Sequence, residues 1–336
     1  MKLDVMGLGG LIIDDVLMVS EEFLATIPGR KGGMEPVSYE MLQELREASG
    51  IEPISIPGGS AANTMKGLAR LGRKAGMLGK IGEDDLGRYY CDWMQGKGVQ
   101  MMLVSTKTPT ARLLALVTPD GQRTFRTFQG ASLEMGAADL REHFFEQAHF
   151  LHVEGYSLFN GDLIEKAMGM AKHLGLKISF DMANFEIVRQ FKSTISHLLE
   201  HYVDIIFCNQ DEARAFTGCS EKETVEILGS MCEVGVVSLA ERGCYVSDGR
   251  KAIHCPAYLI ESPLDTTGAG DLFASGFLHG YLAGREIREC ARFGSMTGAS
   301  VIQVPGAEIP EGLWGPILGS IEHGEPFMPQ VAGCRA

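Results

Sequence analysis

The second half of the chain alternates short apolar runs with longer segments of helical periodicity. From about residue 148 onward, the apolar runs fall at 149–153, 176–180, 204–208, 234–238 and 243–246. The remaining segments predict helices over 160–174, 186–200, 210–217, 221–232, 271–283 and 286–302. Short apolar strands separated by helices are typical of a mostly parallel central sheet with helices on both faces. The pattern therefore predicts an α/β fold.

The first half of the chain combines strands and helices less regularly. A strand over 3–9 ends in a glycine turn, and a second strand covers 11–19. Short helices are predicted over 21–26 and 38–48, then a helix over 60–71, a strand over 75–81 and a helix over 84–97. Strands at 103–118 and 122–129 flank Pro119-Asp120-Gly121, which predicts a β-hairpin.

Composition and charge argue against some classes of function for this protein. The 336 residues are 45% hydrophobic and 22% charged, which is enough apolar material for one large α/β domain over 1–336. The chain has 30 Lys and Arg against 43 Asp and Glu, a net charge of −13, and no basic run. We therefore expect neither nucleic-acid nor anionic-membrane binding, since both require clustered positive charge. Small molecules remain as partners.

The cysteines and the N-terminal segment indicate a cytoplasmic protein. No Cys-x-x-Cys motif or zinc spacing occurs, so we expect reduced thiols, most of them buried. Asp4, Asp14 and Asp15 interrupt the first apolar stretch, which favours neither a signal peptide nor a membrane span. The 8 cysteines are at 91, 208, 219, 232, 244, 255, 290 and 334.

The most informative motif runs from Asp265 to Phe273, with the sequence Asp-Thr-Thr-Gly-Ala-Gly-Asp-Leu-Phe, and it opens a predicted helix. Gly268, Ala269 and Gly270 carry little or no side chain, so their amides and the helix N-terminus can converge on an anion. Asp271 lies where it could take a proton from a hydroxyl that attacks phosphorus. The alternative is an ordinary helix N-cap.

Two further motifs follow predicted strands or turns. Gly58-Gly59-Ser60-Ala61-Ala62-Asn63 opens a helix, and an Asn in its first turn suits a vicinal diol, although an ordinary tight turn would look the same. Asn209 ends an apolar strand three residues before Glu212, a spacing that also makes a good capping box. In open α/β sheets, ligands bind at the carboxyl ends of the strands. That rule directs attention to 7–14, Asp181, Asn209 and the loop before residue 271.

In this order, the three motifs resemble those of the ribokinase family, also called the PfkB carbohydrate kinases, over nearly the whole chain. The long segment between Asp14 and Gly58, with Val19-Ser20-Glu21-Glu22-Phe23-Leu24, is most similar to the adenosine-kinase branch. The resemblance implies a ribokinase-like fold with a small β lid, formed by the hairpin at 103–130 and part of 12–56. It also implies a kinase. The oligomeric state stays open between a monomer and a homodimer.

The resemblance further implies roles for individual residues. Asp271 would be the catalytic base, with the amides of Gly268, Ala269 and Gly270 around the transferring phosphoryl group. The sugar hydroxyls would bind Asp14, Gly59 and Asn63. ATP would lie near Asn209, Ser238, Gly243 and Ser295, Glu212 would hold Mg²⁺ through water, and Asp265 and Thr267 would hold a monovalent cation such as K⁺.

We therefore expect an ATP-dependent kinase that phosphorylates the primary hydroxyl of a nucleoside such as adenosine, inosine or guanosine. A sugar or sugar acid (ribose, fructose or 2-keto-3-deoxygluconate) is the alternative acceptor, and an inactive ligand-binding protein is the alternative class. Phe23, Leu116 and Phe128 are candidates for contact with the base. Arg123 follows the hairpin turn, where we expect a solvated residue rather than a phosphate ligand.

Overall fold

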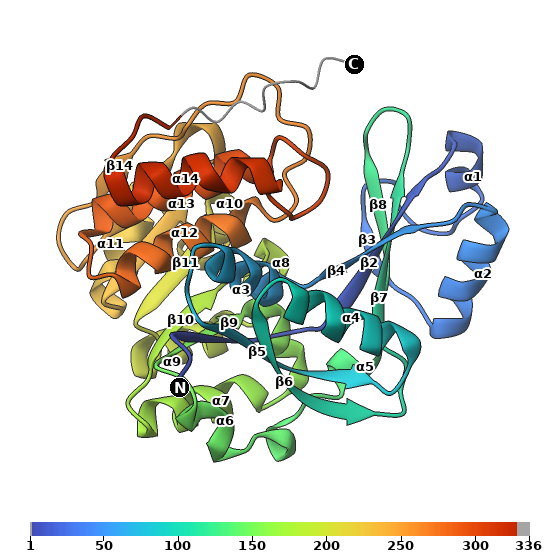
Figure 1. The fold of residues 1–336 in the computed structure, drawn as a ribbon, viewed down its shortest axis with the longest axis horizontal. Coiled ribbons are helices and arrows are strands. Elements are labelled where there is room, and N and C mark those ends of the chain that lie inside the picture. Colours follow the sequence, from blue (N-terminus) through green and yellow to red (C-terminus); the bar gives the residue numbers. More distant parts are fainter. Residues whose placement is uncertain (1, 328–336) are drawn as a thin grey trace.

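The computed structural model describes residues 2–327 and contains a large sheet of nine strands in the order β14-β13-β12-β11-β10-β9-β1-β5-β6 (Figure 1). All pairings from β6 to β12 are parallel, and only β13 and β14 are antiparallel. The expected α/β class is confirmed. The strands are β1 (Val5–Leu8), β5 (Ala75–Gly82), β6 (Val99–Thr106), β9 (Phe150–Glu154), β10 (Lys177–Asp181), β11 (Ile205–Asn209), β12 (Val234–Ser238), β13 (Cys244–Ser247) and β14 (Ile253–Cys255).

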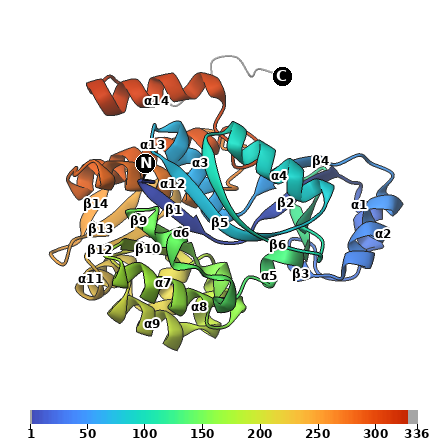
Figure 2. The same cartoon turned by 60° about the horizontal axis from the view of Figure 1, so that its bottom comes forward.

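Helices cover both faces of this sheet (Figure 2). One face packs against α6 (Glu142–Glu146), α7 (Leu163–His173), α8 (Phe185–Gln190), α9 (Lys192–His201), α10 (Gln210–Thr217) and α11 (Glu221–Met231). The other packs against α3 (Ser60–Arg70), α4 (Asp85–Gly96), α12 (Ala269–Leu282) and α13 (Ile287–Val301). Because side chains alternate along a strand, neighbours such as Val5 and Met6 enter different cores.

A second, smaller sheet lies to one side of the large one (Figure 1). Its order is β3-β8-β7-β2-β4, with β2 (Ile12–Met18), β3 (Met34–Pro36), β4 (Ile54–Gly58), β7 (Ala111–Val117) and β8 (Arg123–Phe128). Its outer face packs Leu17, Leu114 and Leu116 against α1 (Glu21–Ala25), and Arg112 pairs there with Asp15. Near this face lies α2 (Tyr39–Ser49), whose Arg46 also approaches Asp15.

The predicted hairpin is present but begins later than expected. Residues 103–106 belong to β6 of the large sheet, and only β7 and β8 form the hairpin around 119–121. The chain breaks between them because Pro109 cannot donate to a ladder, and because Thr110 bonds through both its N–H and its hydroxyl to Asp84. The apolar run Met101-Met102-Leu103-Val104 of β6 leads directly toward the hairpin, so the sequence pattern alone did not separate the two sheets.

Two other predictions differ from the structure. The helix expected over 186–200 is divided at Phe191 into α8 and α9. Helix α14 (Glu311–His323), which the sequence analysis did not predict, packs on α13 through Trp314 and Ile317. The short α5 (Gly130–Leu133) follows the hairpin.

The described cysteines are free thiols, and five of them are buried, in agreement with the prediction. Cys334 lies outside the described residues. Within residues 2–327, no helix is both long and apolar enough to cross a bilayer.

Candidate active site

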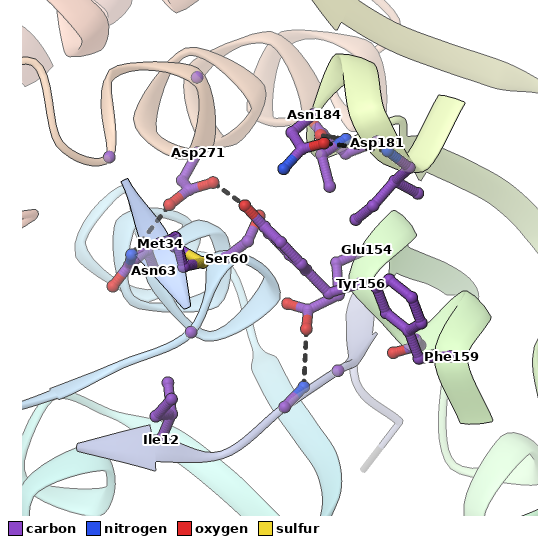
Figure 3. Close-up of a pocket in the computed structure, with 18 of the residues that line it drawn as sticks. Ile12, Met34, Ser60, Asn63, Glu154, Tyr156, Phe159, Asp181, Asn184 and Asp271 are labelled. Atoms are coloured by element: carbon purple, nitrogen blue, oxygen red, sulfur yellow. Dashed lines mark hydrogen bonds between the residues drawn. The ribbon is translucent and has the colours of Figure 1, made fainter. Parts of the chain in front are cut away.

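A cavity of about 910 Å³ lies between the small sheet and the carboxyl ends of β9 to β12 (Figure 3). The small sheet contributes Ile12, Asp14, Met34, Pro36, Leu113 and Thr127, and the first turns of α3 and α12 contribute the residues of both glycine motifs. The strand ends expected from topology, Asp181 and Asn209, also line it. One cavity therefore brings together motifs that are more than 200 residues apart.

Asp271 lies in the first turn of α12 and points across the cavity toward α3 (Figure 3). Ser60 Oγ donates to its Oδ1 at 2.7 Å, and Asn63 Nδ2 donates to its Oδ2 at 2.8 Å. The N-cap of α12 is Gly268, and Asp271 makes no capping bond, so the N-cap alternative for Asp271 is wrong. Burial raises the pKa of Asp271, while the bonds from Asn63 and Ser60 and the charge of Lys66 lower it. The carboxyl group is thus a stronger base than an exposed aspartate.

Glycines are required at the start of both helices. Gly59 has φ +104°, and a Cβ there would lie 2.3 Å from the carbonyl oxygen of Gly10. Gly268 has φ +74°, and its Cβ would lie 2.4 Å from that of Ala307. Larger residues would therefore open the cavity wall at Gly59 and displace the loop 268–270 that begins α12. That loop faces the cavity at the positive end of a helix of 14 residues.

Asp14 reaches the cavity from β2 of the small sheet. Its Oδ2 lies so close to β4 that a Cβ on Gly58 would come within 2.3 Å of it. None of the hydrogen bonds between described residues uses the Asp14 carboxylate. Burial raises its pKa to about 7, although the charge of Lys66 works in the opposite direction. Asp14 is consequently an acceptor whose lone pairs are available to a ligand.

Glu154, which the sequence analysis missed, ends β9 and is buried in the cavity wall (Figure 3). Its Oε1 accepts the N–H of Gly10, and its Oε2 accepts the N–H of Ala61, both at 2.7 Å. Burial raises its pKa to about 7. The side chain links the turn before β2 to the start of α3. Its position directly after an apolar strand, at the edge where ligands bind, was the signal available in the sequence.

Asp181 and Glu212 form the acidic end of the cavity. Glu212 accepts from Asn209 N at 2.8 Å and Asn209 Nδ2 at 2.6 Å, so the capping-box interpretation is confirmed. Burial raises the pKa of both carboxyl groups, and repulsion from neighbouring acids adds to the effect. A divalent cation would offset the cost of holding two ionised carboxylates together in a buried place. Mg²⁺ commonly binds one or two carboxylates together with phosphate oxygens and water. The donor set therefore fits Mg²⁺.

Four predicted site residues lie outside the cavity lining: Gly243, Asp265, Thr267 and Ser295. Gly243 is buried against Cys255, and Ser295 is buried within α13. For these two, contact with a nucleotide remains a prediction. Ser238 does line the cavity and donates weakly to the carbonyl of Cys208 at 3.4 Å.

Two predictions about the small sheet are wrong in detail. Arg123 is not a free turn residue, because its guanidinium pairs with Asp265. Phe23, Leu116 and Phe128 do not line the cavity: the first two pack in the outer cluster, and Phe128 lies against Tyr39 at 5.2 Å. Strand alternation instead turns Leu113 inward.

Comparisons with known proteins agree with this geometry. The model of the pfkB family carbohydrate kinases matches residues 45–312. The crystal structure of adenosine kinase from Sinorhizobium meliloti is 31% identical, covers 93% of this chain and 97% of its own, and superposes with a TM-score of 0.83. A probable sugar kinase from Rhizobium etli is 30% identical, with 92% and 96% covered and a TM-score of 0.82.

Among curated proteins, 2-dehydro-3-deoxygluconokinase of Bacillus subtilis is 27% identical over 262 residues, or 74% of this chain and 81% of that protein. The relatives therefore agree on the phosphotransferase class and on the ribokinase-like fold, and they differ in the acceptor. A matching family model over most of the chain, together with the intact Asp271 site, identifies this protein as a kinase of the pfkB carbohydrate kinase family.

Proposed function

We propose that the protein transfers the γ-phosphoryl group of ATP to the primary hydroxyl of a nucleoside, with Mg²⁺ as cofactor. The observation that carries the proposal is the Asp271 carboxylate, held by Ser60 and Asn63 beside the loop 268–270 and facing the cavity. Each carboxylate oxygen has one protein donor, which leaves a lone pair on each for the acceptor hydroxyl.

The chemical step follows from that arrangement. The oxygen of the primary hydroxyl attacks the γ-phosphorus, its proton passes to Asp271, and the bond from phosphorus to the bridging oxygen breaks to release ADP. The amides of Gly268, Ala269 and Gly270 face the developing charge at the N-terminus of α12. Asp181 and Glu212 would hold Mg²⁺, which when bound neutralises phosphate charge.

The charge of the cavity favours an uncharged acceptor. Its described lining includes carboxylates and no Lys, Arg or His. The two cations whose charge acts on Asp14 are bonded to other groups, Lys66 to the carbonyl of Pro57 and Arg123 to Asp265. A sugar acid would meet repulsion without a positive partner, since like charges at close range cost free energy in a partly buried site. The carboxylates are Asp14, Glu154, Asp181, Glu186, Glu212 and Asp271.

Apolar side chains support a nucleoside over a bare sugar. Met34 and Pro36 of β3 and Leu113 of β7 line the cavity on the same sheet as Asp14. A purine or pyrimidine ring could pack against these aliphatic side chains while Asp14 accepts ribose hydroxyls, and burial of apolar surface contributes about 25 cal/mol per Å². The likeness to an adenosine kinase over 93% of this chain supports the same choice. The free thiols fit a reducing cytoplasm, where ATP is present.

A panel assay tests the proposal. ADP release is measured with adenosine, inosine, guanosine, ribose, fructose and 2-keto-3-deoxygluconate, and a nucleoside is expected to have the highest kcat/KM. A free sugar that outperforms every nucleoside would replace the proposed acceptor class while leaving the kinase chemistry in place.

The Asp271→Asn variant tests the base. It keeps both hydrogen-bonding neighbours but cannot take the proton, so kcat should fall about 10²- to 10⁴-fold. Asp92→Asn, at an exposed position on α4, is the matched control and should retain full turnover. Near-normal kcat in Asp271→Asn, with the fold verified by circular dichroism, would show that Asp271 is not the base.

A further inference from the structure

The pair Asp265 and Thr267, expected to hold a monovalent cation, is occupied by protein groups. Asp265 Oδ1 accepts from Thr267 N at 3.0 Å and from Thr267 Oγ1 at 2.7 Å. Its Oδ2 accepts from Gly306 N at 2.6 Å and from Arg123 Nη2 at 2.5 Å. An ionised carboxylate offers about four acceptor positions, so all of them are in use.

The hydroxyl of Thr267 is also hydrogen-bonded to protein groups. Its hydroxyl donates to Asp265 and accepts from Arg123 Nη1 at 2.9 Å. A monovalent cation is held by oxygen atoms that replace its water shell. The side-chain oxygens of both residues already take part in these hydrogen bonds. They cannot also supply the several oxygen ligands that a cation needs. The side chains of Asp265 and Thr267 therefore have no oxygen left for a cation while Arg123 is in place.

The guanidinium also supplies the charge that a cation would supply. The side chains of Asp265 and Arg123 are only 6% and 22% exposed, so the pair is shielded from water. Burial works to raise the pKa of Asp265, yet the bonds from Gly306 and Thr267 and the charge of Arg123 hold it below its usual value. Arginine stays protonated throughout the working pH range, which makes this a permanent positive charge.

We propose that Arg123 replaces the monovalent cation next to the loop 268–270, so that phosphoryl transfer by this protein needs no added K⁺. Arg123 is the first residue of β8, whereas Asp265 and Thr267 directly precede the loop. It is a positioning residue that acts through Asp265 and Thr267. The shape of the loop therefore depends on the small sheet instead of on an ion, and the kinetic part of this proposal rests on the proposed kinase function.

The kinetic test compares KCl with choline chloride at constant ionic strength. The wild-type kcat/KM should agree within about twofold between the two salts. Arg123→Met, which removes charge and donors but keeps the length, should lose about tenfold in choline chloride and regain part of that loss in KCl. Lys31→Met is the matched control, because Lys31, in the turn before β3, makes solvent-accessible ion pairs with Glu21 and Asp120. It should behave like wild type.

Three results would overturn the proposal: stimulation of the wild type by K⁺, full activity of Arg123→Met in choline chloride, or an equal response of that variant to both salts. A merely structural defect would produce the last of these. If Arg123→Met does not fold, the comparison of wild-type activity in KCl and in choline chloride still tests the proposal.

A second readout does not depend on turnover. The thermal midpoint of the wild type should be the same in KCl and in choline chloride, because nothing binds K⁺ at Asp265. A midpoint raised specifically by K⁺ would overturn the proposal even if no acceptor were phosphorylated. Absence of turnover with every acceptor, with identical midpoints, would instead count against the proposed function alone.

Discussion

Asp14 is a partly buried carboxylate of the cavity that receives no hydrogen bond from the other described residues. Asp14→Ala should therefore weaken acceptor binding by about 1–3 kcal/mol, since ligand hydroxyls would lose their acceptor in a partly buried site. ATP binding should change little, because the loop 268–270 is on the other wall. Calorimetric titration with each ligand separately measures both effects. An unchanged acceptor affinity, with Asp92→Ala as control, would contradict the role.

Lys66 is a buried cation whose Nζ donates to the carbonyl of Pro57 at 3.0 Å, beside the strand pair that holds Asp14. It lies one helical turn after Asn63, the partner of Asp271. Its charge lowers the pKa of Asp271, and Lys66→Met should therefore raise that pKa. The base must be ionised, so activity is lost as the pH falls through its pKa.

The acidic limb of kcat/KM against pH should consequently move to higher pH in Lys66→Met. Lys66→Arg keeps the charge and should leave the limb where it is in the wild type. Superimposable pH profiles for the wild type and the Met variant would show that Lys66 does not act on the base.

The motifs allowed Asp271, Asn63, Asp14 and Glu212 to be predicted, because each stands at a fixed offset from a glycine turn or a strand end. Glu154 and Arg123 could not be assigned from their surroundings in the sequence. Glu154 bonds to an amide 144 residues away, and Arg123 bonds to a carboxylate 142 residues away. Such contacts are set by how the two sheets meet, which local patterns do not encode.

At the scale of elements, periodicity predicted most strands and helices but not their membership of a sheet. β6 and β7 are both mostly apolar, yet they lie in different sheets because Pro109 and the bonds from Thr110 to Asp84 redirect the chain. Helix α14 contains Pro316 and several glycines, which oppose helix by propensity. Burial of Trp314 and Ile317 against α13 outweighs that preference.

The hairpin of β7 and β8 should become more protected when the acceptor binds. It carries Leu113 and Thr127 on the cavity wall, and phosphoryl transfer must exclude water to avoid hydrolysis of ATP. Hydrogen exchange of 111–128 should therefore slow with saturating acceptor, whereas α11, which contributes no residue to the cavity lining, should exchange as before. If hydrogen exchange in the hairpin does not change when the acceptor is added, the hairpin does not act as a lid.

At the scale of the whole molecule, the buried acids should make the ligand-free protein more stable at mildly acidic pH. Burial raises the pKa of Asp14 and Glu154 to about 7, and those of Asp181 and Glu212 also rise. The folded state then binds protons that the unfolded chain releases, so the free energy of unfolding grows as the pH falls through 7.

The buried His152 and the half-buried His279 limit this gain in stability. Burial lowers the pKa of His152 and His279 to about 4, so below their usual 6.5 the unfolded chain binds protons that the folded state does not. Denaturant titrations from pH 8 to about 6.5 should thus show rising stability, with a smaller rise in Glu154→Gln. Stability that falls over this interval would contradict the raised pKa values.

The covering of the small sheet by α1 and α2 bears on how the kinase behaves on dilution. Leu17, Leu114 and Leu116 are already buried by Leu24 and Ile27, so this face offers no broad apolar surface to a second copy. We therefore predict that two copies do not pair through this outer face, and that diluting the enzyme leaves the rate per molecule unchanged as far as this face is concerned.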